Sequence, residues 1–404
     1  MSATAEWTIM VFLNAKNNLE PFAFPNFAQM ASIGSTPQVQ IVVEMGRPRY
    51  HYSDAHGAWS KTLRFHVENA TQPTEAAAVA DLGATNMGDA RSLGDFVTWA
   101  RDRYPAKRTM LVIWNHGQGW RRPAERAGER APQPAMPSAV RYVSNDDDTG
   151  DKLYNRAIQD ELTNRLRGER LDVIAFDACL MSMVETAYAL RGVAKVMVGS
   201  EELEPGTGWD YTSWLQPLVD ARGEIDAAGL GRLLVRGMES TYGDLEPTTL
   251  SATDLDQVES LAAAISRFAT TATPRLAPST VGTYRDARAE CSKYAPAYND
   301  LHSIDLGRFM EQIARGAFDE PVRAAARDVL AALKVAVIQN YASQSRRGKF
   351  GSHGLAIYFP ISGRAHAADA DGAAYGTGPV PFPVEFVAKE KWAGFLRRYC
   401  ELVP

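Results

Sequence analysis

The sequence predicts an α/β fold in which a mostly parallel sheet is flanked by helices. The first half of the chain repeats one pattern, with a short apolar run, a polar turn and then a stretch of helical spacing. Apolar runs that alternate with amphipathic helices are typical of βαβ units, whose strands pair in parallel. The chain is 404 residues long and 45% hydrophobic, which is enough for one large α/β domain and an additional unit.

Five apolar runs are expected to form the core strands. Short apolar runs bounded by polar turns indicate strands that are buried on both faces. The runs are Thr8–Leu13, Val39–Val43, Thr109–Trp114, Leu171–Phe176 and Lys195–Gly199. The helices expected between them are Gly88–Arg103, Asn155–Arg167 and Met181–Arg191.

The character of the chain changes near residue 250. Ser251–Thr270 and Phe309–Tyr341 are Ala-rich with helical spacing, and a last helix is expected over Pro383–Glu401. Gly354–Pro360 (GLAIYFP) reads as a strand and is a candidate to return to the main sheet. We therefore expect a sheet domain over residues 1–250 and a mainly helical subdomain over residues 251–404.

Composition argues against several classes of protein. The net charge of −5 gives no basic face for nucleic acid, and no apolar run approaches the ~18 residues of a membrane span. The N-terminal residues do not read as a signal peptide. Three widely spaced cysteines fit neither a disulfide framework nor a CxxC zinc site. We expect a cytoplasmic protein with reduced thiols, without a nucleic-acid or membrane partner and without a metal or other cofactor.

Residues 121–144 form a stretch rich in Pro, Ala and Arg. It has no periodicity that could bury a face, so an exposed, mobile loop is expected. The stretch is either a tolerated surface insertion or a protease-sensitive linker. It offers five arginines in accessible chain, namely Arg121, Arg122, Arg126, Arg130 and Arg141.

Chemically active side chains follow three of the expected strands. Ligands of an open parallel sheet gather outside the carboxyl ends of its strands. His116 follows the third run, Cys179 the fourth, and an acidic loop over residues 200–211 the fifth. If the third and fourth strands are neighbours, His116 and Cys179 face each other.

Such a pair has a use in nucleophilic catalysis. The thiolate is the nucleophile, and a nearby imidazole lowers the thiol pKa and later protonates the leaving amine. The N–H groups of Gly117 and Cys179 are candidates to hold an oxyanion, and the dipole of the expected helix Met181–Arg191 would favour the thiolate. The alternative is a small buried cysteine and a polar surface histidine. Cys291 and Cys400 follow no core strand.

Five segments in order resemble the clostripain family of cysteine peptidases (C11), which belongs to the caspase-like clan. The segments are WTIMVFLNAKNNLE, LVIWNHGQGW, DVIAFDACLMSMVETAYAL, GSEELEPGTGWDY and GLAIYFP. The resemblance implies a caspase-like fold and a catalytic dyad, with His116 as base and acid, Cys179 as nucleophile and Gly117 in the oxyanion site. It also implies cleavage of peptides after Arg, and sometimes Lys, through a thioester.

The resemblance further implies that Asp177 and Asp210 are acids of the S1 pocket. A basic P1 side chain requires carboxylates, and Arg binds one bidentately. Asp177 lies two residues before Cys179, so the two side chains share a face of an extended chain. The alternatives are that Asp177 caps the next helix and that Asp210 shapes a turn.

Family members are often zymogens that are cut between the His and Cys motifs. The Arg-rich loop lies in that interval, so activation by self-cleavage or by an upstream protease is expected, with Arg130 and Arg141 as candidate processing sites. Some members use calcium, which the acidic run Asn145–Asp151 could attract. This run fails the EF-hand pattern, because Arg156 stands where the bidentate Glu is required. An acidic turn that caps the next helix is expected instead, and no metal is assigned.

Two other functions remain open. An Asp-specific, caspase-type protease would need an Arg-lined pocket, whereas acids follow the fourth and fifth strands. A non-catalytic caspase-like scaffold would bind a partner peptide, with the helical subdomain as its interaction surface. The presence of both His116 and Cys179 argues against that scaffold.

Overall fold

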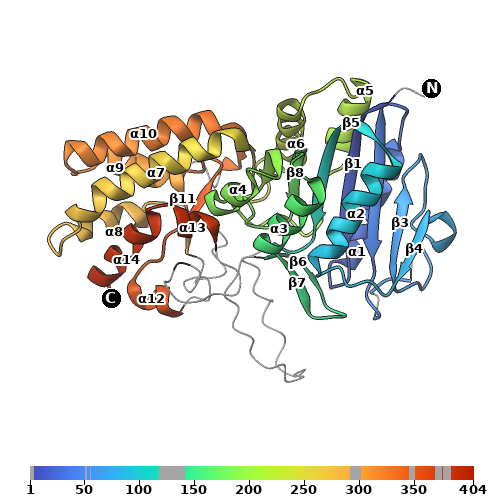
Figure 1. Ribbon diagram of the computed structural model, residues 1–404, viewed down its shortest axis with the longest axis horizontal. Coiled ribbons are helices and arrows are strands. Elements are labelled where there is room, and N and C mark those ends of the chain that lie inside the picture. Colours follow the sequence, from blue (N-terminus) through green and yellow to red (C-terminus); the bar gives the residue numbers. More distant parts are fainter. Residues whose placement is uncertain are drawn as a thin grey trace.

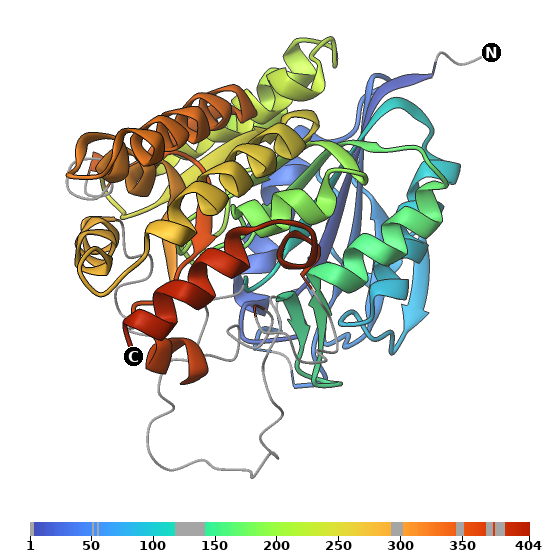
Figure 2. The same cartoon turned by 60° about the vertical axis from the view of Figure 1, so that its left-hand side comes forward.

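The computed structural model describes residues 4–50, 52–54, 56–117, 142–291, 302–344, 351–368, 375 and 384–404. Its centre is a nine-stranded sheet with the order β12-β10-β9-β8-β5-β1-β2-β3-β4 (Figure 1). A second layer of helices lies beside the β12 end of this sheet, as Figures 1 and 2 show from two sides.

The five predicted strands form the parallel centre of the sheet, which confirms that prediction. They are β1 (Ala5–Asn14), β2 (Val39–Gly46), β5 (Ala106–Trp114), β8 (Leu171–Asp177) and β9 (Ala194–Gly199). β1 pairs in parallel with β2 and β5, β5 with β8, and β8 with β9. The two edges are antiparallel, formed by β3 (Thr62–His66) and β4 (Ala80–Gly83) on one side and by β10 (Thr249–Asp254) and β12 (Val337–Ala342) on the other.

Helices cover both faces of this sheet. One face carries α1 (Glu20–Ile33), α5 (Thr212–Asp220) and α6 (Ala227–Tyr242), and the other carries α2 (Ala90–Arg103), α3 (Asn155–Leu166) and α4 (Val184–Leu190). In β1, for example, Val11 packs into the core cluster on one face of the sheet and Phe12 into the cluster on the other face. Successive side chains of a strand point to opposite faces, so a strand covered twice reads as one continuous apolar run.

The helical layer follows β10. It contains α7 (Val258–Ala272), α8 (Val281–Ala289), α9 (Leu306–Arg315), α10 (Glu320–Ala336), α12 (Gly363–Ala368), α13 (Glu385–Lys389) and α14 (Trp392–Leu402). Short 3-10 helices span Glu75–Ala77, Leu255–Gln257 and Thr273–Arg275. Aromatic rings fill the layer, with Phe268 edge-on to Phe309 and Phe359 edge-on to Trp392.

Several boundaries predicted beyond residue 250 are wrong. Residues 251–254 belong to β10 rather than to a helix, and residues 337–341 belong to β12, where the β-branched Val337 and Ile338 favour a strand. The expected helix Phe309–Tyr341 divides into α9 and α10, because Gly316 ends the first and Pro321 stands in the first turn of the second. The last helix likewise divides into α13 and α14.

The late GLAIYFP strand does not join the main sheet. β13 (Ala356–Tyr358) pairs with β11 (Ser303–Asp305) in a separate two-stranded sheet. The Ala356 N–H donates to the Ser182 carbonyl at 3.0 Å, so this segment supports the loop that follows Cys179. The boundary expected at residue 250 falls inside β10, and the sheet continues across it. The division into two domains stays a prediction.

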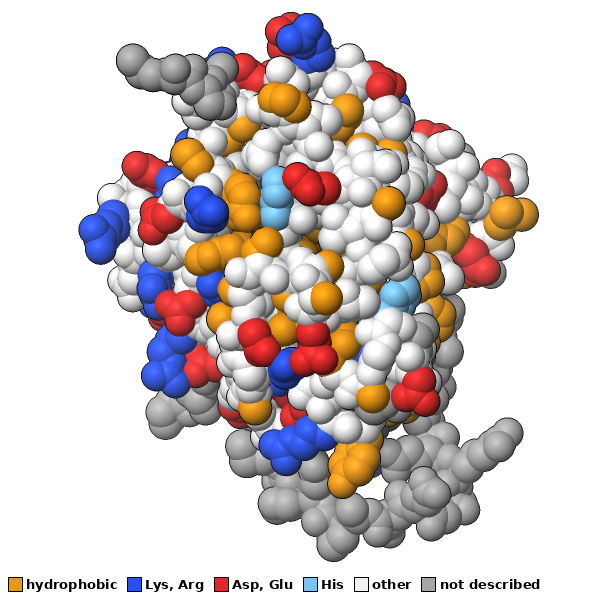
Figure 3. Space-filling model, turned by 90° about the vertical axis from the view of Figure 1, so that its right-hand side faces the viewer, with side chains coloured by type: hydrophobic (Ala, Val, Ile, Leu, Met, Phe, Trp, Pro, Cys, Tyr) orange, Lys and Arg blue, Asp and Glu red, His pale blue; other side chains and the backbone are white. Residues whose placement is uncertain are grey.

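The Arg-rich stretch is described only at its end. Residues 142–144, expected in the loop, begin β6 (Tyr142–Asp146), which forms a hairpin with β7 (Asp151–Tyr154). Arg130 and Arg141 lie outside the described residues. Within the described ranges, no helix combines the length and the apolar character that crossing a bilayer requires. On the face seen in Figure 3, Lys and Arg side chains are interspersed with Asp and Glu.

Candidate active site

The register of the sheet brings the predicted catalytic residues to one edge. β5 and β8 are neighbours, and Trp114 pairs with Asp177 at the carboxyl end of both strands. His116 and Cys179 each follow this pair by two residues, so they occupy matching positions beyond it. The condition on which the predicted pairing depended, that the third and fourth strands are adjacent, is therefore confirmed.

The Cys179 thiol is held by backbone N–H groups. The N–H of Glu204 donates to Sγ at 3.2 Å, and the N–H of Gly117 also interacts with the thiol and lowers its pKa. These groups are outweighed by burial, which together with the carboxylates of Glu204 and Glu202 raises the pKa of Cys179 to about 12. The resting thiol is therefore neutral at physiological pH.

His116 is also neutral at rest. Its side chain is buried, and burial lowers the pKa of the imidazole to about 4. Nε2 lies 2.8 Å from Oδ1 of Asn18, which accepts the ring N–H. A hydrogen bond of this kind fixes the tautomer and leaves Nδ1 as the basic nitrogen.

Asn18 is a site residue that the sequence analysis did not single out. It follows β1, whose end lies at the same edge because Leu13 pairs with Trp114. A neighbouring amide, Asn17, donates to Asn115 Oδ1 at 3.1 Å and ties the two loops together. The Asn-rich turn after β1 was the available signal.

Gly117 is in direct contact with the backbone of Cys179. A Cβ atom at Gly117 would lie 1.8 Å from the Cys179 carbonyl oxygen and 2.7 Å from its nitrogen. No side chain fits in that space, so the sequence must have glycine here. The contact keeps the Gly117 N–H beside the thiol.

The expected helix dipole does not act on Cys179. α4 begins at Val184 rather than at Met181 and is only 7 residues long. The intervening loop is fixed by other contacts, since Leu180 N–H donates to the Glu202 carbonyl at 3.1 Å. Leu180 has a φ of 61°, in the left-handed region that costs a non-glycine residue about 1 kcal/mol.

Asp177 forms part of a buried acidic cluster behind the thiol. Its Oδ2 accepts hydrogen bonds from Tyr211 Oη at 3.0 Å and from the Trp209 N–H at 3.3 Å. The carboxyl of Glu204 lies against that of Asp177. Burial raises the pKa of Asp177 to about 7 and holds that of Glu204 well above its usual range. Gly208, with a φ of 67°, passes directly over the Asp177 carboxylate.

Asp210 makes a different set of contacts. Its Oδ1 accepts hydrogen bonds from the Thr212 N–H at 3.0 Å and from Thr212 Oγ1 at 2.6 Å, at the start of α5. These contacts fit the turn-forming alternative. Its role in a substrate pocket stays a prediction.

The acidic run shapes a hairpin instead of capping α3. Asp146 accepts hydrogen bonds from the N–H groups of Met87, Asp148 and Thr149 at 2.9–3.2 Å. The N-cap of α3 is Tyr154, and its side chain makes no capping hydrogen bond. Among the described residues, no group of three or more His, Cys, Asp or Glu side chains is arranged to hold a metal ion.

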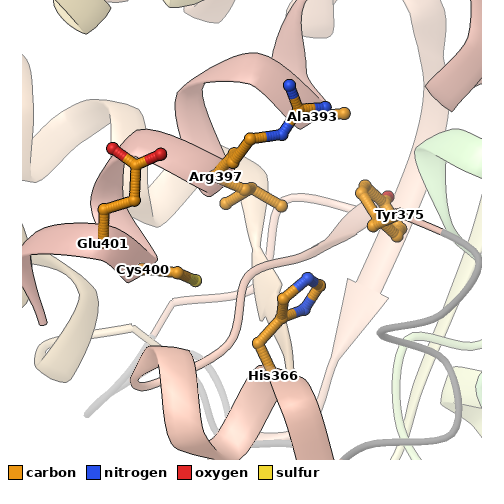
Figure 4. A pocket seen from close by; sticks show the side chains of 7 residues that line it. His366, Tyr375, Ala393, Arg397, Cys400 and Glu401 are labelled. Carbon is orange, nitrogen blue, oxygen red and sulfur yellow. The ribbon is translucent and has the colours of Figure 1, made fainter. Parts of the chain in front are cut away.

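The other two thiols lie in the helical layer. Cys291 is fully buried, and its thiol donates to the Ala287 carbonyl at 3.2 Å. Cys400 lines a hollow of about 370 Å³ between α12 and α14, where Figure 4 shows it beside His366. Burial raises the pKa of Cys400 to about 11. Neither thiol follows a strand of the main sheet.

Comparison with known proteins decides the family. The model of the clostripain family (peptidase C11) matches residues 11–388. The chain belongs to the clostripain family. The clostripain of Hathewaya histolytica is 24% identical over 404 aligned residues, which cover 87% of this chain and 74% of that protein.

Solved structures of C11 proteases share the caspase-like fold of this clostripain-family chain. A secreted enzyme of Bacteroides thetaiotaomicron, iotapain, has a TM-score of 0.61 at 20% identity and covers 88% of this chain and 94% of its own. A secreted C11 protease of the same organism, solved with an irreversible peptide inhibitor, has a TM-score of 0.66 at 18% identity and covers 96% of this chain and 99% of its own. An inactive C11 zymogen from Parabacteroides distasonis has a TM-score of 0.60 at 18% identity and covers 100% of this chain and 100% of its own.

These findings confirm the predicted family and fold class. The chain is a cysteine peptidase of the clostripain (C11) family. The cytoplasmic location stays a prediction of the sequence, and the Bacteroides relatives are described as secreted.

Proposed function

We propose that this peptidase cleaves peptide bonds after Arg or Lys, with Cys179 as nucleophile and His116 as general base and acid. The observation that carries the proposal is the β5–β8 register, in which both residues follow the Trp114–Asp177 pair by two positions. The buried acid Asp177 behind the thiol supports a basic P1 residue.

The protonation states indicate how the reaction begins. Thiol and imidazole are both neutral at rest, because burial raises the pKa of Cys179 and lowers that of His116. His116 Nδ1 therefore accepts the Sγ proton as sulfur attacks the scissile carbonyl carbon. The N–H groups of Gly117 and Cys179 bind the developing oxyanion, and Asn18 Oδ1 holds the ring through Nε2–H.

The later steps reuse the same groups. The imidazolium of His116 donates its proton to the amine as the C–N bond breaks, which leaves a thioester on Cys179 and frees the amine product. A water molecule then attacks the thioester while His116 accepts its proton. The tetrahedral adduct collapses to the carboxylic acid product, and the thiol is restored.

Charge in the pocket opposes the Asp-specific alternative. The carboxyls of Asp177 and Glu204 are shielded from solvent beside Cys179, and Asp210 is the further S1 acid that the resemblance implies. A carboxylate at P1 would face like charge in a site with little water, which costs several kcal/mol. The positive charge of a guanidinium or ammonium group at P1 complements these carboxyls.

We further propose that cleavage between residues 121 and 144 activates a zymogen. Support comes from the five arginines of residues 121–144, a stretch that lies between the His and Cys motifs, and from the likeness to an inactive C11 zymogen. Arg130 and Arg141 are the candidate sites, cut by the enzyme itself or by an upstream protease. No cofactor is assigned, and a need for calcium is open to test by adding a chelator.

A scan of P1 residues tests this proposal. Fluorogenic peptides with Arg, Lys, Asp or Leu at P1 are offered to the wild type and to Cys179→Ala and His116→Ala, before and after a brief trypsin treatment that is then inhibited. We expect Arg and Lys cleavage that both substitutions abolish. Preference for Asp would refute the pocket, and equal activity in Cys179→Ala would refute the nucleophile.

A further inference from the structure

The acidic loop after β9 contains three glutamates with carboxylate oxygens shielded from solvent, and these are satisfied in different ways. Glu201 Oε2 accepts the Gly354 N–H at 3.0 Å, and Glu202 Oε1 accepts the Leu203 N–H at 2.8 Å. Neither carboxylate oxygen of Glu204 receives a hydrogen bond from the described residues, although both are shielded from solvent. A buried carboxyl left without a donor costs free energy, so its retention calls for a partner outside the resting contacts.

Glu204 stands beside both the nucleophile and the predicted pocket acid. Its N–H donates to Cys179 Sγ, and its carboxyl lies against that of Asp177. The Trp209 indole and the Ala178 N–H lie near the carboxyl and lower its pKa, but neither reaches hydrogen-bond geometry. No Lys, Arg or His of the described residues donates a hydrogen bond to the Glu204 carboxylate, and no cation is among the groups that shift the pKa of Asp177. Two acids without a cation therefore meet beside the thiol.

We propose that Glu204 is a specificity-determining residue, which forms with Asp177 a paired carboxylate site for the cationic group of P1. This inference rests on the proposed function. A guanidinium carries five N–H donors in a plane and can satisfy two carboxylates at once. Asp210, the second S1 acid that the resemblance implies, has its Oδ1 occupied by hydrogen bonds from Thr212 at the start of α5.

The resting pair holds a proton that the substrate displaces. Two carboxyls this close in a dry site do not both ionise, so one of the two stays protonated at rest. A bound cation stabilises the doubly ionised pair and releases that proton to solvent. The cation also offsets the charge of Glu204 that raises the thiol pKa, so a basic P1 residue assists formation of the thiolate.

Substrates that differ only in charge test the inference. Citrulline has the shape of arginine without its charge, so kcat/KM is measured for matched peptides with Arg or citrulline at P1. We expect Glu204→Gln to lower kcat/KM for Arg about 10- to 100-fold, the value of one charged hydrogen bond, and to leave the citrulline value within about 3-fold. Glu202→Gln is the matched control, because it removes a neighbouring charge yet leaves the Arg/citrulline ratio unchanged.

Two outcomes separate this inference from the proposed function. If the wild type prefers Arg and Glu204→Gln keeps its Arg/citrulline ratio, Glu204 is not a specificity carboxylate, while the function stands. If the wild type, nicked or intact, cleaves no Arg peptide, the function fails and the inference fails with it. Glu204→Asp keeps the negative charge, so it is expected to retain part of the preference for Arg over citrulline. If Glu204→Gln acted only by disturbing the structure, Glu204→Asp would not retain that preference.

A binding measurement gives a second readout that needs no turnover. Calorimetry of an arginine-ended peptide amide with the Cys179→Ala protein, in buffers of different ionisation enthalpy, counts the protons released. We expect release on binding, and neither release nor tight binding when Glu204→Gln is added. Equal affinity and equal proton release with and without Glu204→Gln would overturn the inference.

Discussion

Replacement of Gly117 by alanine is the sharpest structural test of the oxyanion site. The added Cβ would lie 1.8 Å from the Cys179 carbonyl oxygen, whereas an ordinary contact begins near 3.4 Å. The two segments must therefore separate by about 1.6 Å, and the atom that has to yield belongs to backbone. A displacement of about 1 Å at a reacting group can cost about 100-fold in rate, and loss of an oxyanion donor costs about as much again.

We expect Gly117→Ala to lower kcat/KM by at least about 100-fold and stability by about 1–3 kcal/mol. The assay is hydrolysis of an Arg peptide, with thermal unfolding followed in parallel. Gly192→Ala is the matched control, because a Cβ at that exposed position meets nothing within 4 Å, so activity stays unchanged. Wild-type activity in Gly117→Ala would refute the close contact with Cys179 and the oxyanion role together.

Two further predictions concern ionisation around the site. Asn18→Ala is expected to lower kcat about 10-fold, which is the equivalent of one hydrogen bond. Asn18→Asp keeps the acceptor, and its carboxylate raises the pKa of the His116 imidazole, so the acid limb of the pH–rate profile moves to higher pH. Identical pH–rate profiles for the two variants would contradict a positioning role for Asn18. Asp177 and Glu204 bind protons more tightly folded than unfolded. Their contribution to stability is therefore complete at low pH and is lost as pH rises from about 4 through about 7. Thermal melts between about pH 5 and pH 8 should show Glu204→Gln losing at least about 1 kcal/mol less stability than the wild type, and parallel losses would argue against the raised pKa of this pair.

The centre of the fold could be predicted because both faces of the sheet are covered. A strand buried on both sides, such as Leu171–Asp177, is apolar at every position except Asp172 and Asp177. The edge strands were missed for the opposite reason. β10 contains the buried polar residues Ser251 and Thr253, and β12 is half exposed, so neither has an apolar run. Their pairing depends on contacts between segments far apart in the chain.

The site shows a similar division. His116, Cys179 and Asp177 could be found because each lies at or just beyond the end of an apolar run, where a parallel sheet gathers its functional groups. Asn18 depends on the β1–β5 register, which the sequence does not fix. Glu204 could not be separated from its neighbouring glutamates, because only the folded loop gives those neighbours backbone donors and leaves Glu204 without one.

Covalent labelling tests the central claim most directly. The protein, intact and trypsin-nicked, is treated with a thiol-reactive peptidyl ketone that carries Arg at P1, and the modified residue is identified by mass spectrometry. We predict one adduct on Cys179, none on Cys291 or Cys400, and much slower labelling by the matched reagent with Asp at P1. Labelling of another cysteine, or equal labelling by the Asp reagent, would contradict the assignment of Cys179 and its acidic pocket.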